Sequence, residues 1–434
     1  MKKSMLLMLV VIMIAALMLS ACASPKQQPE VEEAAVEPEA VEEVAEEEEA
    51  LSGELVVATW AGDPFQSAWQ DMFTKFEEET GVKIIMDPIP WENLREKSAL
   101  ELASGSGEYD VLYVHPFWFR EFVDNDYLVP VKDVVPQEVV DGYVEGLLDL
   151  YTVDGVLYGL PDFITTQTLA YRKDLFDAEG IPEPKSWDDV LNAAEMLSDG
   201  DNVYGISFPA KKTGALGSVY SALLVSNGGW YYDADGNPNI NTQEAIEAAD
   251  FIGELGKYTP PGVLNFHWDE NATAAASGKV AMTLCMTVNS AWLEDPERSA
   301  TVGKWAYAPI TSNKGTPGGI VDSYCWSVAK GTENEKAAAK LIEFISGTEA
   351  QVYFTGKSGT CGATKAYYEN EDLLESTPVL QAMNKTFANT MPNPSWKTWS
   401  AQQETLQTLL QDIIGGKTTG AEAMAALQAQ MEAE

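Results

Sequence analysis

The sequence of 434 residues contains only two histidines, His115 and His267, and four cysteines, with no Cys-x-x-Cys pair. Structural and catalytic zinc sites are built mainly from His and Cys ligands at short spacings. We therefore expect no metal and no other cofactor. Basic residues are also scarce, because 27 Lys and Arg stand against 67 Asp and Glu, a formal net charge of −40. Nucleic acid attracts basic surfaces, so this balance argues against a nucleic-acid partner.

Several catalytic and nucleotide-binding motifs are missing as well. The sequence has no Walker loop, no G-x-G-x-x-G between a strand and a helix, and no Gly-x-Ser-x-Gly nucleophile elbow. What is present is a composition able to form a large core, with 45% hydrophobic and 10% aromatic residues. At about 100–200 residues per domain, the length fits two to four domains or one long two-lobed unit.

The N-terminal segment has the pattern of an export signal. Lys2 and Lys3 precede an apolar run over 5–19, which is short for a membrane span. The run ends in Leu-Ser-Ala-Cys at 19–22, which resembles a bacterial lipobox in which the cysteine becomes the lipidated first residue of the mature chain. We therefore predict a signal peptide over 1–21 and lipidation at Cys22, which would anchor the protein without a spanning helix. A transmembrane anchor is the alternative.

The next segment has the composition of a tether. Residues 25–50 contain eleven Glu, one Lys and no aromatic residue. Such a segment cannot bury enough apolar surface to offset its ordering entropy, and its charges repel one another. We predict a disordered acidic tether over 22–52, with the folded part beginning at 53.

Three cysteines remain after Cys22, and an odd number in an exported protein leaves at least one thiol unpaired. A disulfide between Cys325 and Cys361 and a set of three buried thiols, with Cys285, are both open from spacing alone. No catalytic role follows for any of them.

Strand-like and helix-like segments alternate from residue 53 onward. A strand is predicted over 54–60, a helix over 65–80 ended by Gly81, and a strand over 82–86. A helix over 91–104 and a strand over 109–114 follow, so the order is β-α-β-α-β and the class is α/β with parallel strands. Further segments predicted from the pattern are strands near 156–160, 279–287 and 320–329, helices near 172–179, 187–198, 242–256, 333–346, 400–415 and 419–432, and a loop-rich stretch at 209–230.

Five blocks of the sequence, taken in order, resemble the extracellular solute-binding proteins of sugar-importing ABC transporters, the family that includes maltodextrin-binding proteins. The third block holds Tyr-Gly-Leu-Pro at 158–161 and Tyr-Arg-Lys-Asp-Leu-Phe at 171–176, close to the Y-G-x-P and Y-x-K-D-L-F of that family. The five blocks are 53–85, 106–131, 153–197, 277–293 with 337–354, and 392–430.

The resemblance implies a two-lobed periplasmic-binding-protein type II fold, with several hinge crossings and ligand held in the cleft between the lobes. Lobe 1 would comprise 53–162 and 322–365, and lobe 2 would comprise 163–318 and 366–434. The implied function is a lipid-anchored, non-enzymatic, monomeric substrate-binding component that delivers a sugar or oligosaccharide to ABC permease subunits. It would be exported, at the outer face of the cytoplasmic membrane or in the periplasm.

Sugar recognition needs aromatic rings for the C–H faces and short polar groups for the hydroxyls. The chain has 12 Trp, many of them after predicted strands, where open α/β sheets bind ligands. The ligand-binding candidates, from strand ends and family position, are Trp60, Asp63, His115, Phe117, Trp118, Asp162, Thr165, Thr166, Tyr220, Trp230, Trp292 and Trp396.

Each candidate has a structural alternative. Asp63 could cap a helix with Pro64 at its first position, and His115 could be a structural partner. Core packing is favoured for Trp69, Trp91, Trp187 and Trp305, which lie at helix starts or on helix faces.

The chain also departs from the maltodextrin binders, which carry acidic residues where Pro116 and Thr165 stand here, so maltose is not assumed to be the ligand. Two other functions are weighed. A lipid-anchored glycoside hydrolase would need two carboxylates facing each other across a cleft, and 67 acidic residues make such pairs uninformative. A sugar-sensing lipoprotein without a transporter is the other alternative.

Overall fold

A computed structural model describes residues 51–434, apart from 63, 145, 201, 395 and 397. The predicted signal peptide, Cys22 and the tether up to residue 50 lie outside the described residues. Ala50–Glu434 form one compact unit. In this described part, none of the helices has the length and apolar character required to cross a membrane.

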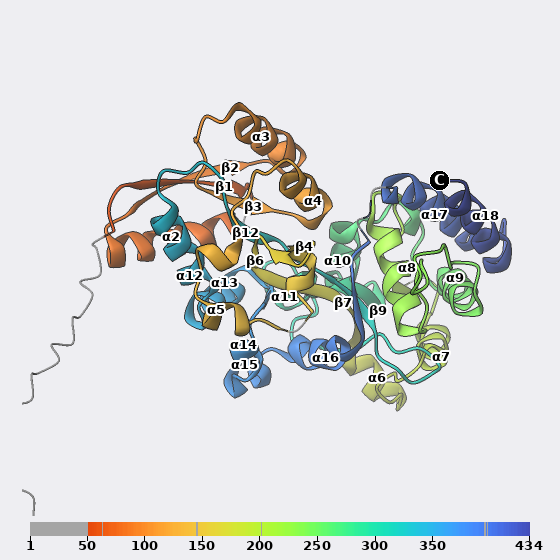
Figure 1. Cartoon of the computed structure of the whole chain (residues 1–434). Helices are drawn as coiled ribbons and strands as arrows, with labels where there is room; N and C mark the ends of the chain where they lie inside the picture. Colours follow the sequence, from red (N-terminus) through yellow and green to blue (C-terminus); the bar gives the residue numbers. More distant parts are fainter. Residues whose placement is uncertain (1–50, 63, 145, 201, 395, 397) are drawn as a thin grey trace, which may run out of the picture. The chain divides into compact units, whose positions relative to one another are not determined.

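The N-terminal half of the chain builds most of a five-stranded sheet (Figure 1). Strand β1 (Glu54–Trp60) lies between β2 (Lys83–Ile89) and β3 (Val111–Val114) and runs parallel to both. The order continues through β12 (Cys325–Val328) to β6 (Leu160–Pro161), both paired antiparallel. The predicted β-α-β-α-β unit is thus confirmed.

Helix α2 (Phe65–Thr80) shows why this unit forms. Its buried side chains recur at helical spacing, and Gly81 ends the helix with a left-handed φ of 77° that an L side chain disfavours. Helix α3 (Trp91–Ser104) matches the predicted bounds. The buried positions of α2 are Phe65, Ala68, Trp69, Met72, Phe73 and Phe76.

A second sheet is organised around β7 (Phe163–Arg172), in which all ten residues are buried. The order is β14 (Thr390–Pro392), β11 (Gly319–Asp322), β7, β9 (Val280–Met286) and β8 (Tyr204–Ser207). Strands β10 (Trp305–Ala308) and β13 (Cys361–Gly362) also pair with β7, at its two ends. A strand that is covered on both faces shows no alternation of apolar and polar residues in its sequence. Its central position is therefore known only from the strands that pair with it.

The chain passes between the two sheets at three places within the described residues. It leaves β6 and enters β7 around residue 162, and it returns from β11 to β12 across 323–324. The third passage follows α12 (Glu335–Ser346) and α13 (Thr348–Ser358) and leads into β13. The predicted strand 320–329 is therefore two strands in different sheets. The lobe boundaries drawn from the resemblance stay a prediction.

The predicted loop-rich stretch at 209–230 is wrong. It contains α8 (Ala215–Ser226), a helix in which every residue is buried. Apolar and small residues occupy every face of this helix, so its sequence lacks the amphipathic period by which a helix is predicted. Helices α9 (Gln243–Gly256), α17 (Trp399–Ile414) and α18 (Gly420–Ala433) pack around α8 or against one another. The remaining helices are α4 (Pro116–Asp124), α5 (Gln137–Asp141), α6 (Lys173–Glu179), α7 (Trp187–Leu197), α10 (Trp268–Ala276), α11 (Ser290–Glu294), α14 (Lys365–Tyr368), α15 (Glu371–Ser376) and α16 (Pro378–Thr386), and the short strands β4 (Thr152–Val153) and β5 (Val156–Leu157) form a hairpin.

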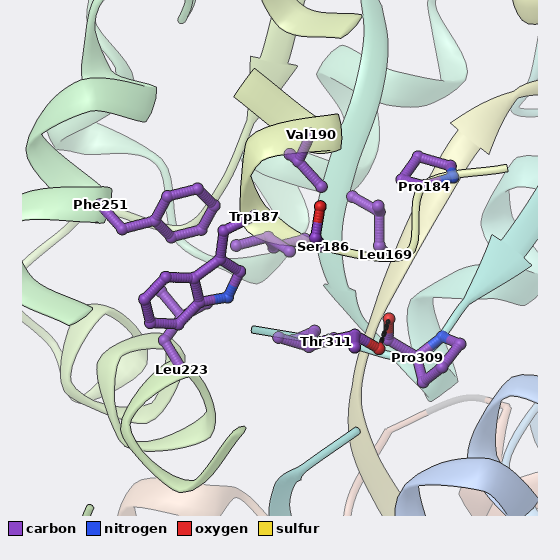
Figure 2. A pocket seen from close by; sticks show the side chains of 11 residues that line it. Leu169, Pro184, Ser186, Trp187, Val190, Leu223, Phe251, Pro309 and Thr311 are labelled. Atoms are coloured by element: carbon purple, nitrogen blue, oxygen red, sulfur yellow. Dashed lines mark hydrogen bonds between the residues drawn. The ribbon is translucent and has the colours of Figure 1, made fainter. Parts of the chain in front are cut away.

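The two sheets have separate hydrophobic cores. One groups Leu55, Val57 and Trp326 with the buried face of α2, and the other surrounds α8. The packing roles predicted for Trp69, Trp187 and Trp305 are confirmed, since all three are buried. Figure 2 shows Trp187 beside Phe251. The two ring centroids are 4.5 Å apart, and the interplanar angle is 6°. The side chain of Trp91 lies outside the described part.

The structure decides between a disulfide and three buried thiols. Cys285, Cys325 and Cys361 are free and buried, so the possible disulfide is absent. Burial raises the pKa of the Cys285 thiol to about 12 and moves the pKa values of the other two upward as well. The thiols are therefore inert packing groups at neutral pH.

Candidate functional site

An aromatic stack stands where the strands of the first sheet end. The ring of Tyr324 lies parallel to that of Tyr113, at 4.8 Å and 4°, and nearly parallel to that of Trp60, at 5.9 Å and 10°. His115 meets Tyr324 edge-on at 4.6 Å. We call these four residues the platform. Trp60 and Tyr324 are partly exposed, and Tyr113 is buried beneath them.

The sheet order brings the platform together. Trp60 is the last residue of β1, Tyr113 lies in β3, and Tyr324 directly precedes β12, which pairs with β3. Sequence reasoning found Trp60 but missed Tyr324. A tyrosine next to the start of a strand is a weak signal for a ligand site. Tyr324 lies beside Tyr113 only because β12 pairs with β3, and the two tyrosines are more than 200 positions apart in the sequence.

His115 has a structural role in addition to its place in the platform. It is the N-cap of α4, where its Nδ1 accepts a hydrogen bond from the backbone N–H of Phe117 at 3.2 Å. Its Nε2 lies 3.4 Å from Oδ1 of Asp322. Among the neighbouring candidates, Phe117 is 47% exposed, whereas Trp118 is only 6% exposed. Of these two rings, Phe117 is the one available to a ligand.

Polar groups lie beside the platform at the chain passages between the sheets. Asp322, at the end of β11, accepts a hydrogen bond from Asn393 Nδ2 at 2.8 Å and has 16% of its side chain exposed. Thr165 Oγ1 lies 3.1 Å from Thr287 Oγ1, and both threonines are buried. Sequence reasoning missed Asp322 and Asn393, since a single acidic residue after a strand is common in this chain.

Two polar candidates are buried in the structure. Thr166 is fully buried, and its hydroxyl donates to the Ile320 carbonyl at 2.6 Å, which ties β7 to β11. Asp162 is 3% exposed, and its carboxylate accepts from Trp69 Nε1 at 3.2 Å and from Tyr113 Oη at 3.1 Å. Both side chains are therefore engaged by protein groups in this structure, and a direct ligand contact by either of them stays a prediction.

A second group of rings packs in and against the hydrophobic core that surrounds α8. Trp396 packs edge-on against Trp230 at 6.4 Å, Tyr232 at 5.0 Å and Trp399 at 4.9 Å, with Tyr231 beneath at 5.5 Å. We call these five residues the aromatic cluster. Trp230, Tyr232 and Trp396 are partly exposed, whereas Tyr231 and Trp399 are buried. A cavity of about 360 Å³ is lined by Trp230 and Tyr232 together with Asn239, Asn389 and Met391.

One glutamine fixes the exposed rings of the aromatic cluster. Gln402 Oε1 accepts from Trp396 Nε1 at 2.7 Å, and Gln402 Nε2 donates to Tyr232 Oη at 3.3 Å. Gln402 is 1% exposed on α17, so both rings are held from below by a buried amide. Sequence reasoning missed this role, because glutamines are frequent in α17.

The loop position predicted for Tyr220 is wrong. This residue lies in α8 rather than in a loop, it is fully buried, and its hydroxyl donates to the Ala245 carbonyl at 3.1 Å. Trp292 is partly exposed on α11, and the Arg298 guanidinium lies 4.7 Å from its ring centroid. Asp63 lies outside the described residues. None of the described candidates lines the two larger cavities, of about 570 and 710 Å³.

The arrangement as a whole offers flat rings and neutral or singly charged hydrogen-bonding groups. Within the described residues, no group of three or more His, Cys, Asp or Glu side chains could hold a metal ion. Ring faces flanked by a carboxylate and amides suit a ligand with alternating C–H and hydroxyl surfaces.

Two α/β lobes joined by repeated chain passages are the architecture of type II periplasmic binding proteins. A maltose-bound T. maritima protein, MalE3, superimposes on this fold with a TM-score of 0.77 at 21% identity, covering 88% of this chain and 99% of that one. The model of the bacterial extracellular solute-binding protein family matches residues 62–352. Since this is more than half of the sequence, the chain belongs to that family of extracellular solute-binding proteins.

Curated relatives agree with this assignment. A putative binding protein of Brucella abortus is 25% identical over 361 residues, which cover 80% of this chain and 85% of that protein. A mannitol-binding protein of Pseudomonas aeruginosa is 26% identical over 314 residues, covering 69% and 71% respectively.

Proposed function

We propose that this chain is the substrate-binding component of an ABC importer and that it captures a sugar, a polyol or an oligosaccharide between its two lobes. The observation that carries the proposal is the platform, in which the partly exposed rings of Trp60 and Tyr324 stand beside Asp322 and Asn393. Family membership and the maltose and mannitol of the compared proteins support the same ligand class.

The chemistry of the platform fits such a ligand. A pyranose or an extended polyol presents C–H groups that pack on a ring face, and its hydroxyls donate to carboxylates and accept from amide N–H groups. Asp322 supplies an acceptor and Asn393 supplies a donor, already oriented by the hydrogen bond between them. The partly exposed rings of the aromatic cluster, Trp230 and Trp396, would add stacking surface on the second lobe.

Delivery and anchoring complete the proposal. Closure of the lobes over ligand would present a surface to permease subunits, driven by contacts that exist only in the closed state. Lipidation at Cys22 would hold the protein at the outer face of the membrane, with the acidic segment before residue 53 as a tether.

A thermal-shift screen tests the proposal. Maltose, mannitol, ribitol and arabino-oligosaccharides are compared with a panel of amino acids. A ligand at 100 times its Kd stabilises the native state by about 2.7 kcal/mol, which raises Tm by several degrees. Trp60→Ala should remove the shift, whereas Tyr353→Ala, at an exposed tyrosine of α13 whose hydroxyl donates to Asp71, should retain it.

The outcome also separates the alternatives. A labelled oligosaccharide recovered intact after incubation identifies a binder, whereas cleavage identifies a glycoside hydrolase. If the protein binds a sugar but does not stimulate uptake of that sugar by a permease encoded next to its gene, it is a sensor. A shift with amino acids alone, or with no compound of the carbohydrate panel, contradicts the proposed ligand class.

A further inference from the structure

A buried carboxylate lies directly beneath the platform. Asp162 is 3% exposed at the point where β6 leads into β7, and the groups that donate to it are uncharged: the Trp69 indole and the Tyr113 hydroxyl. An ionised carboxylate in such a place is expensive to bury, and a neutral residue of similar size would avoid that cost. A feature of this kind calls for a role beyond packing.

Asp162 holds Tyr324 in two ways. Its backbone N–H donates to the Tyr324 carbonyl at 2.8 Å, which ties the passage at 162 to the passage at 323–324. Its carboxylate accepts from the hydroxyl of Tyr113, whose ring lies parallel to that of Tyr324 at 4.8 Å. The position and the tilt of the Tyr324 ring are therefore both linked to Asp162, and the Trp60 ring lies nearly parallel to that of Tyr324 at 5.9 Å.

We propose that Asp162 is the positioning residue of the platform, and that the charge on its carboxylate sets how tightly Tyr113 and Tyr324 are held for ligand binding. The proposal rests on the proposed function, because it takes the platform to be the ligand site. Asp162 acts through the two tyrosines and touches no ligand itself.

The titration of Asp162 supplies the means to test this. Burial raises the pKa of Asp162 to about 6, and the Trp326 indole, the Tyr113 hydroxyl and the Trp69 indole, which favour the ionised form, keep it from rising further. The titratable groups facing Asp162 are Tyr113, Tyr143 before the short helix at 148–151, and Cys325 in β12. Burial raises the pKa of all three, so they stay neutral, and Asp162 is the one of these four groups that changes charge between pH 5 and 8.

Protonation should loosen the platform. A hydrogen bond to an ionised carboxylate is roughly twice as strong as one to a neutral acceptor. The hydrogen bond from the Tyr113 hydroxyl to Asp162 therefore weakens as Asp162 takes up a proton. Ligand affinity should then fall as the pH drops through 6.

The experiment combines a ligand-free measurement with a binding measurement on the full chain. Near-UV circular dichroism, which reports on packed tyrosine and tryptophan rings, should show a transition near pH 6 in the wild-type protein. Asp162→Asn should abolish the transition. Asp177→Asn, at an exposed aspartate of α6, is the control and should keep it.

Titration with maltose and with mannitol, followed by tryptophan fluorescence from pH 5 to 8, gives the second readout. Wild-type Kd should rise several-fold from pH 7.5 to pH 5, whereas Asp162→Asn should bind about tenfold more weakly at pH 7.5, with a flat profile. Tyr113→Phe keeps the ring but breaks the link, so it should also flatten the affinity profile.

The results distinguish this proposal from the proposed function. If no carbohydrate binds, the proposed function fails, and the circular dichroism transition still decides whether Asp162 sets the ring packing. If a sugar binds and Asp162→Asn keeps both the wild-type affinity and the wild-type pH profile, Asp162 is a structural residue only. A dichroism transition that persists in Asp162→Asn overturns the proposal as well.

Discussion

Trp230 and Trp396 meet edge to face, with ring centroids 6.4 Å apart and an interplanar angle of 76°. Trp230 follows α8 through Gly228 and Gly229, whereas Trp396 precedes α17, so the contact joins segments more than 160 residues apart. Both rings are partly exposed, and Trp230 lines the cavity of about 360 Å³. Partly exposed rings of this kind are the ones that can stack on a ligand.

The first prediction concerns Trp230. Because a stacked indole contributes about 1–3 kcal/mol, Trp230→Ala should weaken sugar binding roughly tenfold or more, with little change in the Tm of the free protein. Trp187→Ala is the control and should do the reverse, since Trp187 is 5% exposed and stacked on Phe251. Calorimetric titration and thermal melts measure both effects. Unfolding of the free Trp230→Ala protein would make Trp230 a core residue.

The second prediction concerns Trp292. Its ring is partly exposed and faces the Arg298 guanidinium at 4.7 Å. Trp292→Ala should weaken binding by about tenfold if the ring stacks on a ligand. Arg298→Gln removes only the cation–π contact, about 0.5–1 kcal/mol at an exposed site, and should leave affinity nearly unchanged. Equal affinities of Trp292→Ala and the wild type would remove Trp292 from the site.

The third prediction is closure. Passages between the two sheets at 162 and 323–324 provide short segments about which the lobes can rotate. Small-angle scattering should give a smaller radius of gyration with saturating sugar than without it. An unchanged radius at saturation would contradict a hinge mechanism.

The fourth prediction concerns the N-terminus. Cys22→Ser should release the protein from membranes or leave it unprocessed, because the acyl chains on the cysteine would supply the anchor. Mass spectrometry of the mature wild-type protein checks this directly. A mature chain that begins elsewhere with an unmodified residue would rule out lipidation.

The fifth prediction uses the stability cost of Asp162. Its pKa is raised to about 6 in the folded protein from an ordinary 3.8, so the folded state holds the extra proton between these values. The contribution of Asp162 to the free energy of unfolding is therefore greatest at low pH. It falls as the pH rises through 6, by up to about 3 kcal/mol. Asp162→Asn lacks this loss.

The measurement is the difference in unfolding free energy between Asp162→Asn and the wild type. It should shift in favour of the variant by about 1–3 kcal/mol from pH 4.5 to pH 7.5. The comparison cancels the contributions of the other acidic residues, which both proteins share. A constant difference over this range would place the pKa of Asp162 outside it.

Local pattern alone determined many of the elements. The helical spacing of apolar residues in α2, with Gly81 after it, predicts a helix that ends where the structure ends it. The predicted bounds 91–104 and 242–256 agree with α3 and α9 to within one residue, and the order of strands and helices was enough for the α/β class. These features are readable because amphipathic period and turn chemistry are encoded over a few neighbouring residues.

Only the tertiary structure decided which side chains meet. Tyr220 and Asp162 resembled site residues in sequence, but α8 buries the first and the Trp69–Tyr113 pair encloses the second. Tyr324 became part of the platform because β12, which follows it, pairs with β3, a strand far from β12 in the sequence. Strand order and register are set by the summed burial of whole faces, and this non-local balance leaves no mark on the residues that happen to end side by side.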